Sequence, residues 1–354
     1  MSAMTQMQSH QTSNPQVVDS TVDVVLPELF RLFLSEQPRV NPHYDLVKKE
    51  SEAWFVKECQ LGDHLRRILD KTDFSYFCAV AVPDAGRIEL RTLCDWGNWV
   101  FPFDDLFDNG ALKDDPYKAN SVINALLSDM GRGVGRNICT NGRDQLPSHS
   151  QALLDVHKSV WRRIVQSSSV GVQDRFADSI RDYLEGTIRQ VYCRSRNQNP
   201  TFEETFAMRR GSAGVSPLFA LAEYALKLDL PDKVFENESI KEIQRIGVDF
   251  VVIHNDILSY CKEEAEEVPH NLVAITRYQM QSFNRQSRHA QDAFDIVGNI
   301  LSTLYKRWFL ALAELPSWGE RVDADVQKYI ATVRAIVMAN LNWRQVFSIP
   351  FGWL

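Results

Sequence analysis

The sequence predicts an all-α protein, and two observations support this fold class. Apolar residues recur at helical spacing over long stretches, most clearly over residues 170–194. No β-hairpin dipeptide lies between alternating apolar runs, and no glycine-rich turn joins a strand pattern to a helix pattern. We therefore expect ten or more helices in a single domain over residues 21–354. Residues 1–20 are polar and lack an apolar period, so we expect a disordered tail there.

The composition excludes several classes of protein. Of the 354 residues, 44% are hydrophobic and 24% are charged, which is enough apolar material for a large core. The net charge of −7 leaves no basic footprint for nucleic acid. Six scattered cysteines without a CxxC pair indicate reduced, mostly buried thiols. Charges and a proline interrupt the apolar stretch over residues 22–34, so we expect a cytoplasmic protein without a membrane span.

The first third of the chain contains several short helical patterns. We expect helices over residues 44–60 and 62–69, which follow a proline-rich loop. Residues 73–82 are apolar enough for a buried helix, although a buried strand has the same composition. A Pro-Asp-Ala-Gly turn over residues 83–86 precedes the segment 87–103, which leads into an acidic stretch.

The rest of the chain continues with longer helical patterns. Glu203 and Glu204 stand where the first turn of a helix would begin, as the helix dipole favours. The expected helices cover residues 120–130, 151–165, 170–194, a stretch from 201, 217–228, a stretch from 231, 239–262, 271–306 with one break, and 322–347.

Five aspartates gather in the stretch FPFDDLFDNGALKDD, residues 101–115. If this segment ends a helix, Asp104 and Asp108 project from one face, and Asp105 lies about 100° round the helix from Asp104. Three such carboxylates repel one another unless a cation lies among them, and hard oxygen ligands suit Mg²⁺. The alternative is an ordinary solvated helix end that is rich in acidic residues.

A second polar stripe lies in an otherwise apolar segment, VDFVVIHNDILSY. Asn255, Ser259 and Glu263 are spaced at i, i+4 and i+8, so they line one face of a helix over about 12 Å. An amide oxygen, a hydroxyl and a carboxylate are all donors that Mg²⁺ accepts. Hydrogen bonds between helices would also satisfy these polar groups.

The order of these motifs resembles the class I terpene synthases, most closely the fungal, basidiomycete-type sesquiterpene synthases. Residues 104–108 match D-D-x-x-D, and residues 255–263 match N-D-x-x-S-x-x-x-E. The segment RRGSAG, which begins at Arg209, is similar to the R-x-x-S-x-G segment of the family. Arg209 precedes Asn255 by 46 residues (255 − 209), which is about the interval of the family.

The resemblance implies a fold, a reaction and a cofactor. The fold would be the single-domain class I terpenoid synthase fold, a helical bundle around a central active-site cavity. The enzyme would ionise farnesyl diphosphate to an allylic carbocation and release diphosphate with a sesquiterpene, either a cyclic hydrocarbon or an alcohol. Three Mg²⁺ ions are expected, with Mn²⁺ as an alternative. The protein would be a monomer or a homodimer.

The resemblance also implies roles for the acidic residues. Asp104 would be the first Mg²⁺ ligand, assisted by Asp108. Asp105 and Asp108 would form hydrogen bonds or salt bridges when diphosphate is bound. The ligands of the remaining metal would be Asn255, Ser259 and Glu263.

The same resemblance assigns the cationic residues and the helix break. Arg209 and Lys262 would bind the diphosphate oxygens, and a guanidinium suits this geometry. Ser212 would occupy the linker position, and Ala213 with the following glycine would direct a backbone carbonyl at the carbocation. Arg210 is expected to be an ordinary surface charge.

An aromatic wall is expected because ring faces stabilise cations. Phe77, Phe101 and Trp343 are its candidates, and Trp343 matches a tryptophan in the last helix of the family. The loop over residues 316–323 is expected to border the mouth of the site, where Arg321 would assist in binding diphosphate.

One feature departs from the pattern of the family. An Arg-Tyr pair usually follows six and seven residues after the tryptophan, but Ile349 and Pro350 stand at those positions here. Either Arg344 or another cation replaces the pair, or the site closes less tightly. Our hypothesis is that looser closure admits water, which favours hydroxylated or acyclic products.

Several alternatives remain open. Prenyl-chain elongating enzymes carry a second aspartate-rich motif where this chain has NDxxSxxxE. A class II cyclase needs DxDD, and residues 323–326 read DADV. A monoterpene or diterpene synthase would use another prenyl diphosphate, and a catalytically dead relative would bind the diphosphate without turnover.

Overall fold

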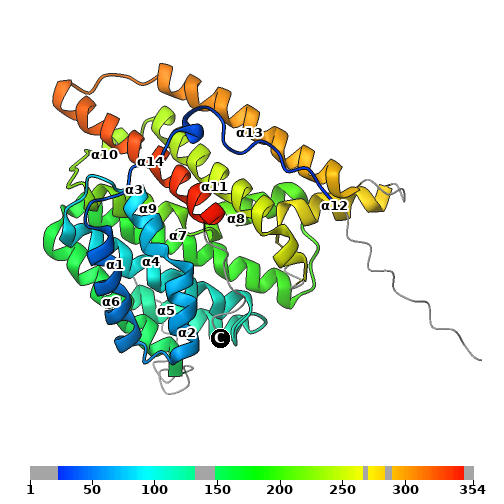
Figure 1. Cartoon of the computed structure of the whole chain (residues 1–354), viewed down its shortest axis with the longest axis horizontal. Helices are drawn as coiled ribbons and strands as arrows, with labels where there is room; N and C mark the ends of the chain where they lie inside the picture. The colour runs from blue at the N-terminus through cyan, green and yellow to red at the C-terminus, as the bar shows by residue number, and fades with distance from the viewer. Residues whose placement is uncertain (1–22, 132–147, 266–269, 284–288, 347–354) are drawn as a thin grey trace, which may run out of the picture.

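The protein is a bundle of helices, and no strand occurs among the residues that the computed structural model describes, 23–131, 148–265, 270–283 and 289–346. The expected all-α class is confirmed (Figure 1). The predicted tail, residues 1–20, lies outside the described residues. The elements in order are η1 (Leu32–Ser35), α1 (Tyr44–Glu58), α2 (Asp63–Thr72), α3 (Phe74–Ala81), α4 (Arg87–Asp108), α5 (Pro116–Asp129), α6 (Ser148–Ser167), α7 (Val170–Ser195), α8 (Phe202–Ser212), α9 (Val215–Ala225), α10 (Asp232–Phe235), α11 (Glu238–Ala265), α12 (Leu272–Phe283), α13 (His289–Ala313) and α14 (Glu320–Val346).

Local sequence determines where several of these helices begin. The side chain of Thr201 accepts a hydrogen bond from the backbone N–H of Glu204, whose carboxylate accepts one from the N–H of Thr201. This reciprocal pair satisfies two N–H groups that the first turn of α8 would otherwise leave unpaired. Asp73 ends α2 at φ 43° and caps α3 by accepting from Tyr76 N at 3.1 Å. The helix over residues 73–82 is therefore confirmed, and the strand alternative is wrong.

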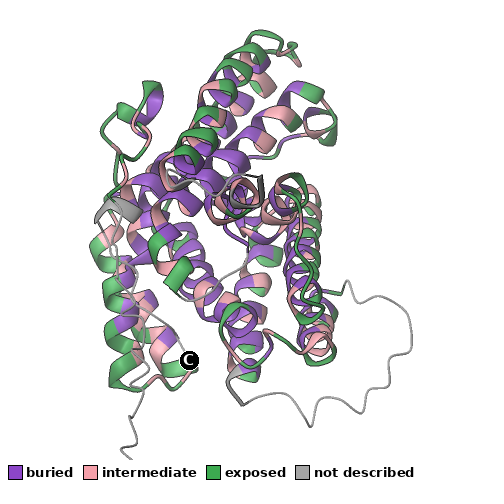
Figure 2. Cartoon of the chain, turned by 90° about the vertical axis from the view of Figure 1, so that its right-hand side faces the viewer, coloured by how far each residue is buried: buried purple, intermediate pink, exposed green. Residues whose placement is uncertain are grey.

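Two helices in the interior carry the two acidic motifs. α11 is buried along residues 246–257, except that Asn255 is half-buried, and it packs against α8, α9, α12, α13 and α14. α4 is similarly buried and packs against α1, α3, α6, α7 and α9. Figure 2 shows buried residues on the inward faces of the helices and exposed residues outside. The core therefore holds both motif-bearing helices in fixed positions.

α7 and α8 cross at two glycines. A Cβ atom on Gly186 of α7 would lie 2.5 Å from the backbone N of Ser212 and 2.9 Å from the Cα of Gly211 on α8. No side chain fits in that space, because the obstructing atoms belong to the backbone. The glycine of the RRGSAG segment thus lets α8 lie directly on α7, which determines where Arg209 and Ser212 point.

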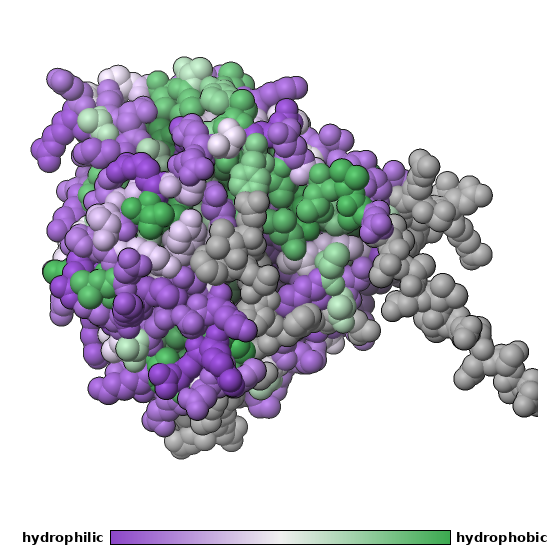
Figure 3. All heavy atoms as spheres, in the orientation of Figure 1, coloured by the Kyte–Doolittle hydropathy of each residue, from purple (hydrophilic) through white to green (hydrophobic). Residues whose placement is uncertain are grey.

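The surface is mostly hydrophilic, and the apolar side chains that Figure 3 shows gather in its upper half. Phe309 and Leu310 of α13 are among the exposed large apolar residues. No helix within the described parts of the chain is long and apolar enough to cross a membrane. Of the five described cysteines, three are buried, one is half-buried and one is exposed: Cys78, Cys94, Cys193, Cys59 and Cys261. These five thiols are free.

Candidate active site

The acidic stretch forms the end of α4, as the spacing predicts. α4 continues through Pro102 and ends at Asp108, so Asp104 and Asp108 lie one turn apart on the same face. Asp105 is buried, and its Oδ1 accepts a hydrogen bond from Asn109 Nδ2 at 3.3 Å. The backbone carbonyl of Asp105 accepts from the N–H of Gly110 at 2.7 Å, which closes the last turn.

Asp104 is held by a tyrosine from α7. The hydroxyl of Tyr183 donates to Asp104 Oδ1 at 2.7 Å, and Tyr183 itself is buried. Burial raises the pKa of Asp104 to about 6, although the Tyr183 hydrogen bond and the nearby Arg209 oppose that shift. Sequence reasoning missed Tyr183, because its position in the apolar pattern of residues 170–194 is that of an ordinary core residue.

Asp108 brings the first motif close to the second. Asp108 is solvent-exposed at the end of α4, although nearby protein atoms partly desolvate its carboxyl group. This desolvation, together with the charges of Asp104 and Glu263, raises the pKa of Asp108 to about 8. Arg209 acts in the opposite direction. Carboxylates that raise one another's pKa in this way are suited to share a bound cation.

The second motif lies on one stripe of α11, as expected. Ser259 Oγ donates to the backbone carbonyl of Asn255 at 2.7 Å and lies 3.4 Å from Asn255 Oδ1. One further turn along, Glu263 Oε2 accepts a hydrogen bond from Asn271 Nδ2 at 2.9 Å. Three oxygen donors of different chemistry are therefore presented in a row.

Arg209 lies between the two motifs. Its Nη2 donates to Asp256 Oδ1 at 2.6 Å and to Asn255 Oδ1 at 3.2 Å. Burial lowers the pKa of Arg209, but Asp256 and Glu263 more than offset it, so the pKa is raised and the guanidinium stays charged. Its buried Nε has no hydrogen-bond partner among the described residues. Arg209 thus carries a permanent charge and an unused donor at the site.

Asp256, the second residue of the NDxxSxxxE motif, supports Arg209 from within the core. It is fully buried, and its Oδ2 accepts from the backbone N of Leu272 at 2.8 Å. Burial raises the pKa of Asp256 to about 6, against the influence of Arg209. One carboxylate therefore connects Arg209 on α8 with the first residue of α12. Only its place beside Asn255 in the motif could have indicated this role.

The prediction that Arg210 is an ordinary surface charge is wrong. Its Nε and Nη2 bind Asp249 at 2.6 and 3.0 Å, and Asp249 is only 1% exposed. The guanidinium also lies over the ring of Phe206, 4.1 Å from its centroid. The tertiary contact with α11 provides a buried partner that the local sequence of α8 does not reveal.

A helix break follows Arg209, as the resemblance implies. α8 ends at Ser212, and α9 begins at Val215 after Gly214, whose φ of 66° favours glycine. Ser212 is buried, and its Oγ lacks a hydrogen-bond partner within the described residues. A Cβ on Gly214 would lie 3.8 Å from the ring of Tyr183, so the break adjoins the residue that holds Asp104. The linker and effector roles of Ser212 and Ala213 stay predictions.

The three predicted aromatic residues meet around a fourth, Phe74. Phe74 stacks on Phe77 at 4.5 Å between centroids, and it meets Phe101 and Trp343 edge-on at 4.9 and 5.4 Å. Trp343 is further fixed by a hydrogen bond from its Nε1 to Thr72 O. Phe77 and Trp343 are 3% and 1% exposed, whereas Phe101 is half-buried. Phe101 also packs against Trp343 at 5.3 Å between centroids, and it is the most exposed ring of this cluster.

The expectation for the loop over residues 316–323 is wrong. The loop begins α14, whereas Trp343 lies near the end of that helix, about 35 Å away at 1.5 Å per residue. Arg321 is exposed there, and Asp323 accepts a hydrogen bond from Trp318 N. The loop precedes α14 in the sequence, but Trp343 lies near the other end of that helix. The length of α14 therefore separates the loop from Trp343.

The structure describes only some of the other residues that the sequence singled out. Lys262 is half-buried in the last turn of α11, next to Glu263. Ile349, Pro350 and the side chain of Arg344 lie outside the described residues.

The donor set is suited to a divalent metal. In the described ranges, no three His, Cys, Asp or Glu side chains gather into a metal cluster. A metal site would therefore combine carboxylates with the amide of Asn255 and the hydroxyl of Ser259, and such hard oxygen donors are those that Mg²⁺ prefers. Desolvation and the carboxylates of Asp104 and Glu263 raise the pKa of Asp108, and a cation among these groups would favour their charged forms.

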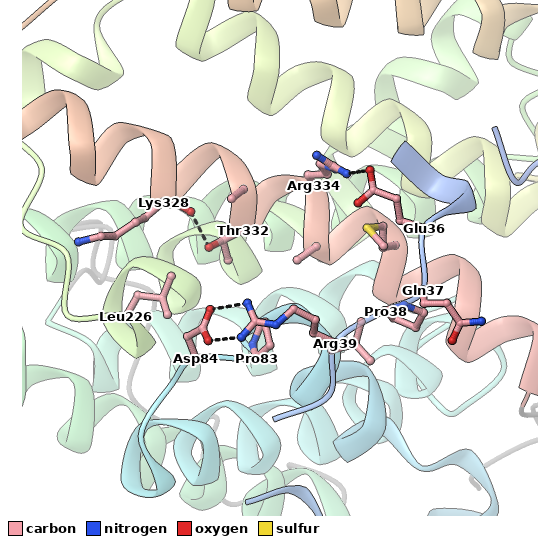
Figure 4. A pocket seen from close by; sticks show the side chains of 14 residues that line it. Glu36, Gln37, Pro38, Arg39, Pro83, Asp84, Leu226, Lys328, Thr332 and Arg334 are labelled. Atoms are coloured by element: carbon pink, nitrogen blue, oxygen red, sulfur yellow. Dashed lines mark hydrogen bonds and ion pairs between the residues drawn. The ribbon is translucent and has the colours of Figure 1, made fainter. Parts of the chain in front are cut away.

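A separate pocket of about 520 Å³ lies away from these residues, between α14 and the loop before α1 (Figure 4). Its charged side chains are already paired. Arg39 binds both carboxylate oxygens of Asp84, and Arg334 binds Glu36. This pocket therefore presents matched charges and is not the candidate site.

Comparison with known proteins agrees with this arrangement. The model of the family described as "Terpene synthase family 2, C-terminal metal binding" matches residues 95–307. The chain is 38% identical over 331 residues to silphinene synthase of Penicillium patulum, covering 93% of this chain and 86% of that protein. It is 26% identical over 341 residues to sesquiterpene synthase 1 of Postia placenta, covering 96% and 94%. The solved structure of an α-eudesmol synthase shares the fold, with a TM-score of 0.74 at 18% identity over 90% of this chain and 99% of that one.

Proposed function

Because the chain belongs to the terpene synthase family, we propose that it is a Mg²⁺-dependent sesquiterpene synthase that acts on farnesyl diphosphate. The observation that carries this proposal is the position of Arg209 between the two acidic motifs. A permanent cation beside two sets of oxygen donors is suited to a diphosphate with its metal ions. The name of the Postia placenta relative supports a C15 substrate.

The metal would be held by residues from both motif-bearing helices. Asp104 and Asp108 would contribute from α4, with three ions expected and Mn²⁺ as an alternative to Mg²⁺. Bound Mg²⁺ would neutralise the diphosphate oxygens and so improve diphosphate as a leaving group. The ligands from α11 would be Asn255, Ser259 and Glu263.

The protein's own side chains would then bind and shield the substrate. Arg209 and Lys262 would bind the diphosphate oxygens, with Asp105 and Asp108 pairing to cations around them. The allylic C–O bond breaks heterolytically, and its electron pair leaves with diphosphate. Phe101, the most exposed ring of the aromatic cluster, would stabilise the resulting carbocation by about 0.5–2 kcal/mol. Water must be excluded until cyclisation is complete, because water quenches the cation.

The proposal is tested by incubating the purified protein with Mg²⁺ and, separately, geranyl, farnesyl and geranylgeranyl diphosphate. Extracts are analysed by gas chromatography–mass spectrometry while diphosphate release is followed. A C15 product that disappears with EDTA supports the proposal. Turnover of only the C10 or C20 substrate indicates a monoterpene or diterpene synthase. Diphosphate binding without turnover of any substrate indicates a catalytically dead relative.

The same extracts test the hypothesis of looser closure. If water enters the site, a large share of the C15 product carries a hydroxyl group or is acyclic. A product mixture of cyclic hydrocarbons alone contradicts the hypothesis, because quenching by water leaves an oxygen atom in the product.

A further inference from the structure

We propose that Asn271, which lies outside both metal-binding motifs, is a positioning residue that orients Glu263 for Mg²⁺. This inference rests on the proposed function. Asn271 is fully buried, and its Nδ2 donates to Glu263 Oε2 at 2.9 Å. A side chain that holds a metal ligand in one rotamer reduces the conformational entropy that this ligand loses when the metal binds.

The orientation of the Asn271 amide is determined by its other hydrogen bonds. Its Oδ1 accepts from the backbone N–H groups of Val273 and Ala274 at 2.9 and 3.1 Å. These two donors require an oxygen on that side of the amide, so the NH₂ group must face Glu263 and the backbone carbonyl of Asp256. The donor to Glu263 is thus built into the first turn of α12.

Glu263 needs such support because of its place in the chain. It lies two residues before the end of α11 and is half-buried, where helix ends are least constrained. A long, flexible glutamate there has several accessible rotamers. The hydrogen bond from Asn271 selects one of them before any metal binds.

Asn271 also connects Glu263 to the residue that would bind diphosphate. One carboxylate oxygen of Asp256 accepts a hydrogen bond from the backbone N–H of Leu272, and the other accepts one from Arg209 Nη2. The first turn of α12 is therefore anchored to α11 by Asp256 and by Asn271 together. Arg209 lies on α8 and Glu263 on α11, yet both are held by the buried side chains of Asp256 and Asn271.

The alternative is that Asn271 serves only as the N-cap of α12, and Asn271→Asp separates the two roles. Aspartate caps helices as well as asparagine does, because a carboxylate oxygen accepts from the same two N–H groups. It has no donor for Glu263, however, and its charge repels the glutamate. If Asn271 only caps α12, losing its hydrogen bond to the Asp256 carbonyl lowers the melting temperature but leaves the Mg²⁺ midpoint unchanged.

Asn237→Asp is the matched control. Asn237 caps the other end of α11, where its Oδ1 accepts from Ser239 N and Ile240 N at 3.0 and 3.3 Å. It lies 26 residues before Glu263 (263 − 237), about 39 Å along the helix. The same change of chemistry is thus made at a cap that touches no candidate metal ligand.

The experiment measures melting temperature against Mg²⁺ concentration in the presence of inorganic diphosphate. Mg²⁺ stabilises the wild type and Asn237→Asp with the same midpoint, whereas Asn271→Asp needs about 10- to 100-fold more Mg²⁺. An unchanged midpoint in Asn271→Asp overturns the inference and leaves the proposed function standing. No stabilisation of the wild type by Mg²⁺ and diphosphate overturns the proposed function and the inference with it.

Two further variants keep the inference falsifiable if Asn271→Asp does not fold. Asn271→Ser retains a capping hydroxyl that is too short to reach Glu263, and it adds no charge, so we expect a smaller rise of the midpoint in the same direction. In a Glu263→Ala background, Asn271→Ser should have no additional effect on the midpoint, because the acceptor of the Asn271 hydrogen bond is absent. Additive effects of the two changes would show that Asn271 does not act through Glu263.

Discussion

Single side chains outside the motifs hold the candidate ligands in place. Tyr183 donates to Asp104 from α7, across 79 residues of sequence, and it also adjoins the helix break at Gly214. Its hydroxyl contacts the first motif, and its ring lies beside that break. At this scale the site depends on buried hydrogen bonds as much as on the ligands themselves.

Tyr183→Phe should impair the site without unfolding the protein. Loss of a hydrogen bond to a charged acceptor costs about 1.5–3 kcal/mol, which corresponds to about 10- to 100-fold in kcat/KM or in Mg²⁺ requirement. Steady-state kinetics over a range of Mg²⁺ concentrations measures both quantities.

Tyr224→Phe is the control for that variant. Tyr224 is also buried, and its hydroxyl donates to Thr92 Oγ1 at 3.2 Å rather than to a candidate ligand. An equal loss of Mg²⁺ dependence in both variants would remove the positioning role of Tyr183.

Asp108 gives the stability of the metal-free protein a distinctive dependence on pH. Its raised pKa of about 8 means that the folded state binds a proton which the unfolded state has released. The contribution of Asp108 to the stability of the metal-free protein is therefore full below about pH 4 and is lost as the pH rises to about 8. Melting temperatures of the wild type and Asp108→Asn, measured with EDTA from pH 5 to 9, isolate this contribution.

The expected result is that Asp108→Asn becomes relatively more stable than the wild type as the pH rises. Because Mg²⁺ competes with the proton, the Mg²⁺ affinity of the wild type should rise over the same range. A constant difference between the two melting curves would show that Asp108 has an ordinary pKa.

At the scale of helices, two ion pairs fasten α8 to α11. Arg209 and Arg210 are adjacent on α8, and their partners Asp256 and Asp249 are seven residues apart, on one face of α11. The pair of Arg209 adjoins the candidate site, whereas that of Arg210 lies two turns away. The second pair therefore adds a contact between α8 and α11 beyond the one at the site.

Arg210→Ala should destabilise the fold. Asp249 is 1% exposed and, among the residues that the structure describes, keeps only Arg245 as its ion-pair partner, so we expect a loss of about 1–3 kcal/mol. Chemical denaturation measures the change. The control is Arg181→Ala, because its partner Asp178 is exposed rather than buried and their pair should contribute no more than about 1 kcal/mol. Equal stabilities of the two variants would contradict a structural role for Arg210.

The crossing of α7 and α8 predicts that two glycines of α7 differ sharply in their tolerance of alanine. Gly186→Ala places a Cβ 2.5 Å from the backbone of Ser212, so the helices must separate, at a cost of about 1–3 kcal/mol. Activity should fall as well, since α8 carries Arg209.

Gly171→Ala is the control in the same helix. Its Cβ would meet only the flexible end of the Arg175 side chain, and alanine favours a helix by about 1 kcal/mol over glycine. Its melting temperature should be unchanged or higher. Equal tolerance of both substitutions would show that α7 and α8 do not need their close contact.

At the scale of the whole molecule, the candidate site exists only because one core holds α4, α7, α8, α11 and α12 together. Its polar side chains come from residues 104 to 271, and no local segment contains more than a few of them. α11 is the common neighbour of α8, α9, α12, α13 and α14. A defect in the packing of α11 would therefore affect metal binding and stability together.

Local patterns were sufficient to predict the fold class and most helices. Residues 239–262 were expected in a helix that the structure gives as Glu238–Ala265, and residues 170–194 in one that spans Val170–Ser195. Helical periodicity is a property of neighbouring residues, so it can be read without knowing the fold. Errors fell where a partner was distant in sequence, as for Arg210, or where helix length separated a loop from the site, as for residues 316–323.

The sequence by itself determined an all-α chain with two acidic motifs and an arginine at fixed intervals, because spacing along a helix decides which side chains share a face. Only the tertiary structure decided that Tyr183 holds Asp104, that Asp256 binds Arg209 and that Asn271 holds Glu263. These contacts join different helices, and their geometry follows from how the helices pack in the core rather than from any local pattern.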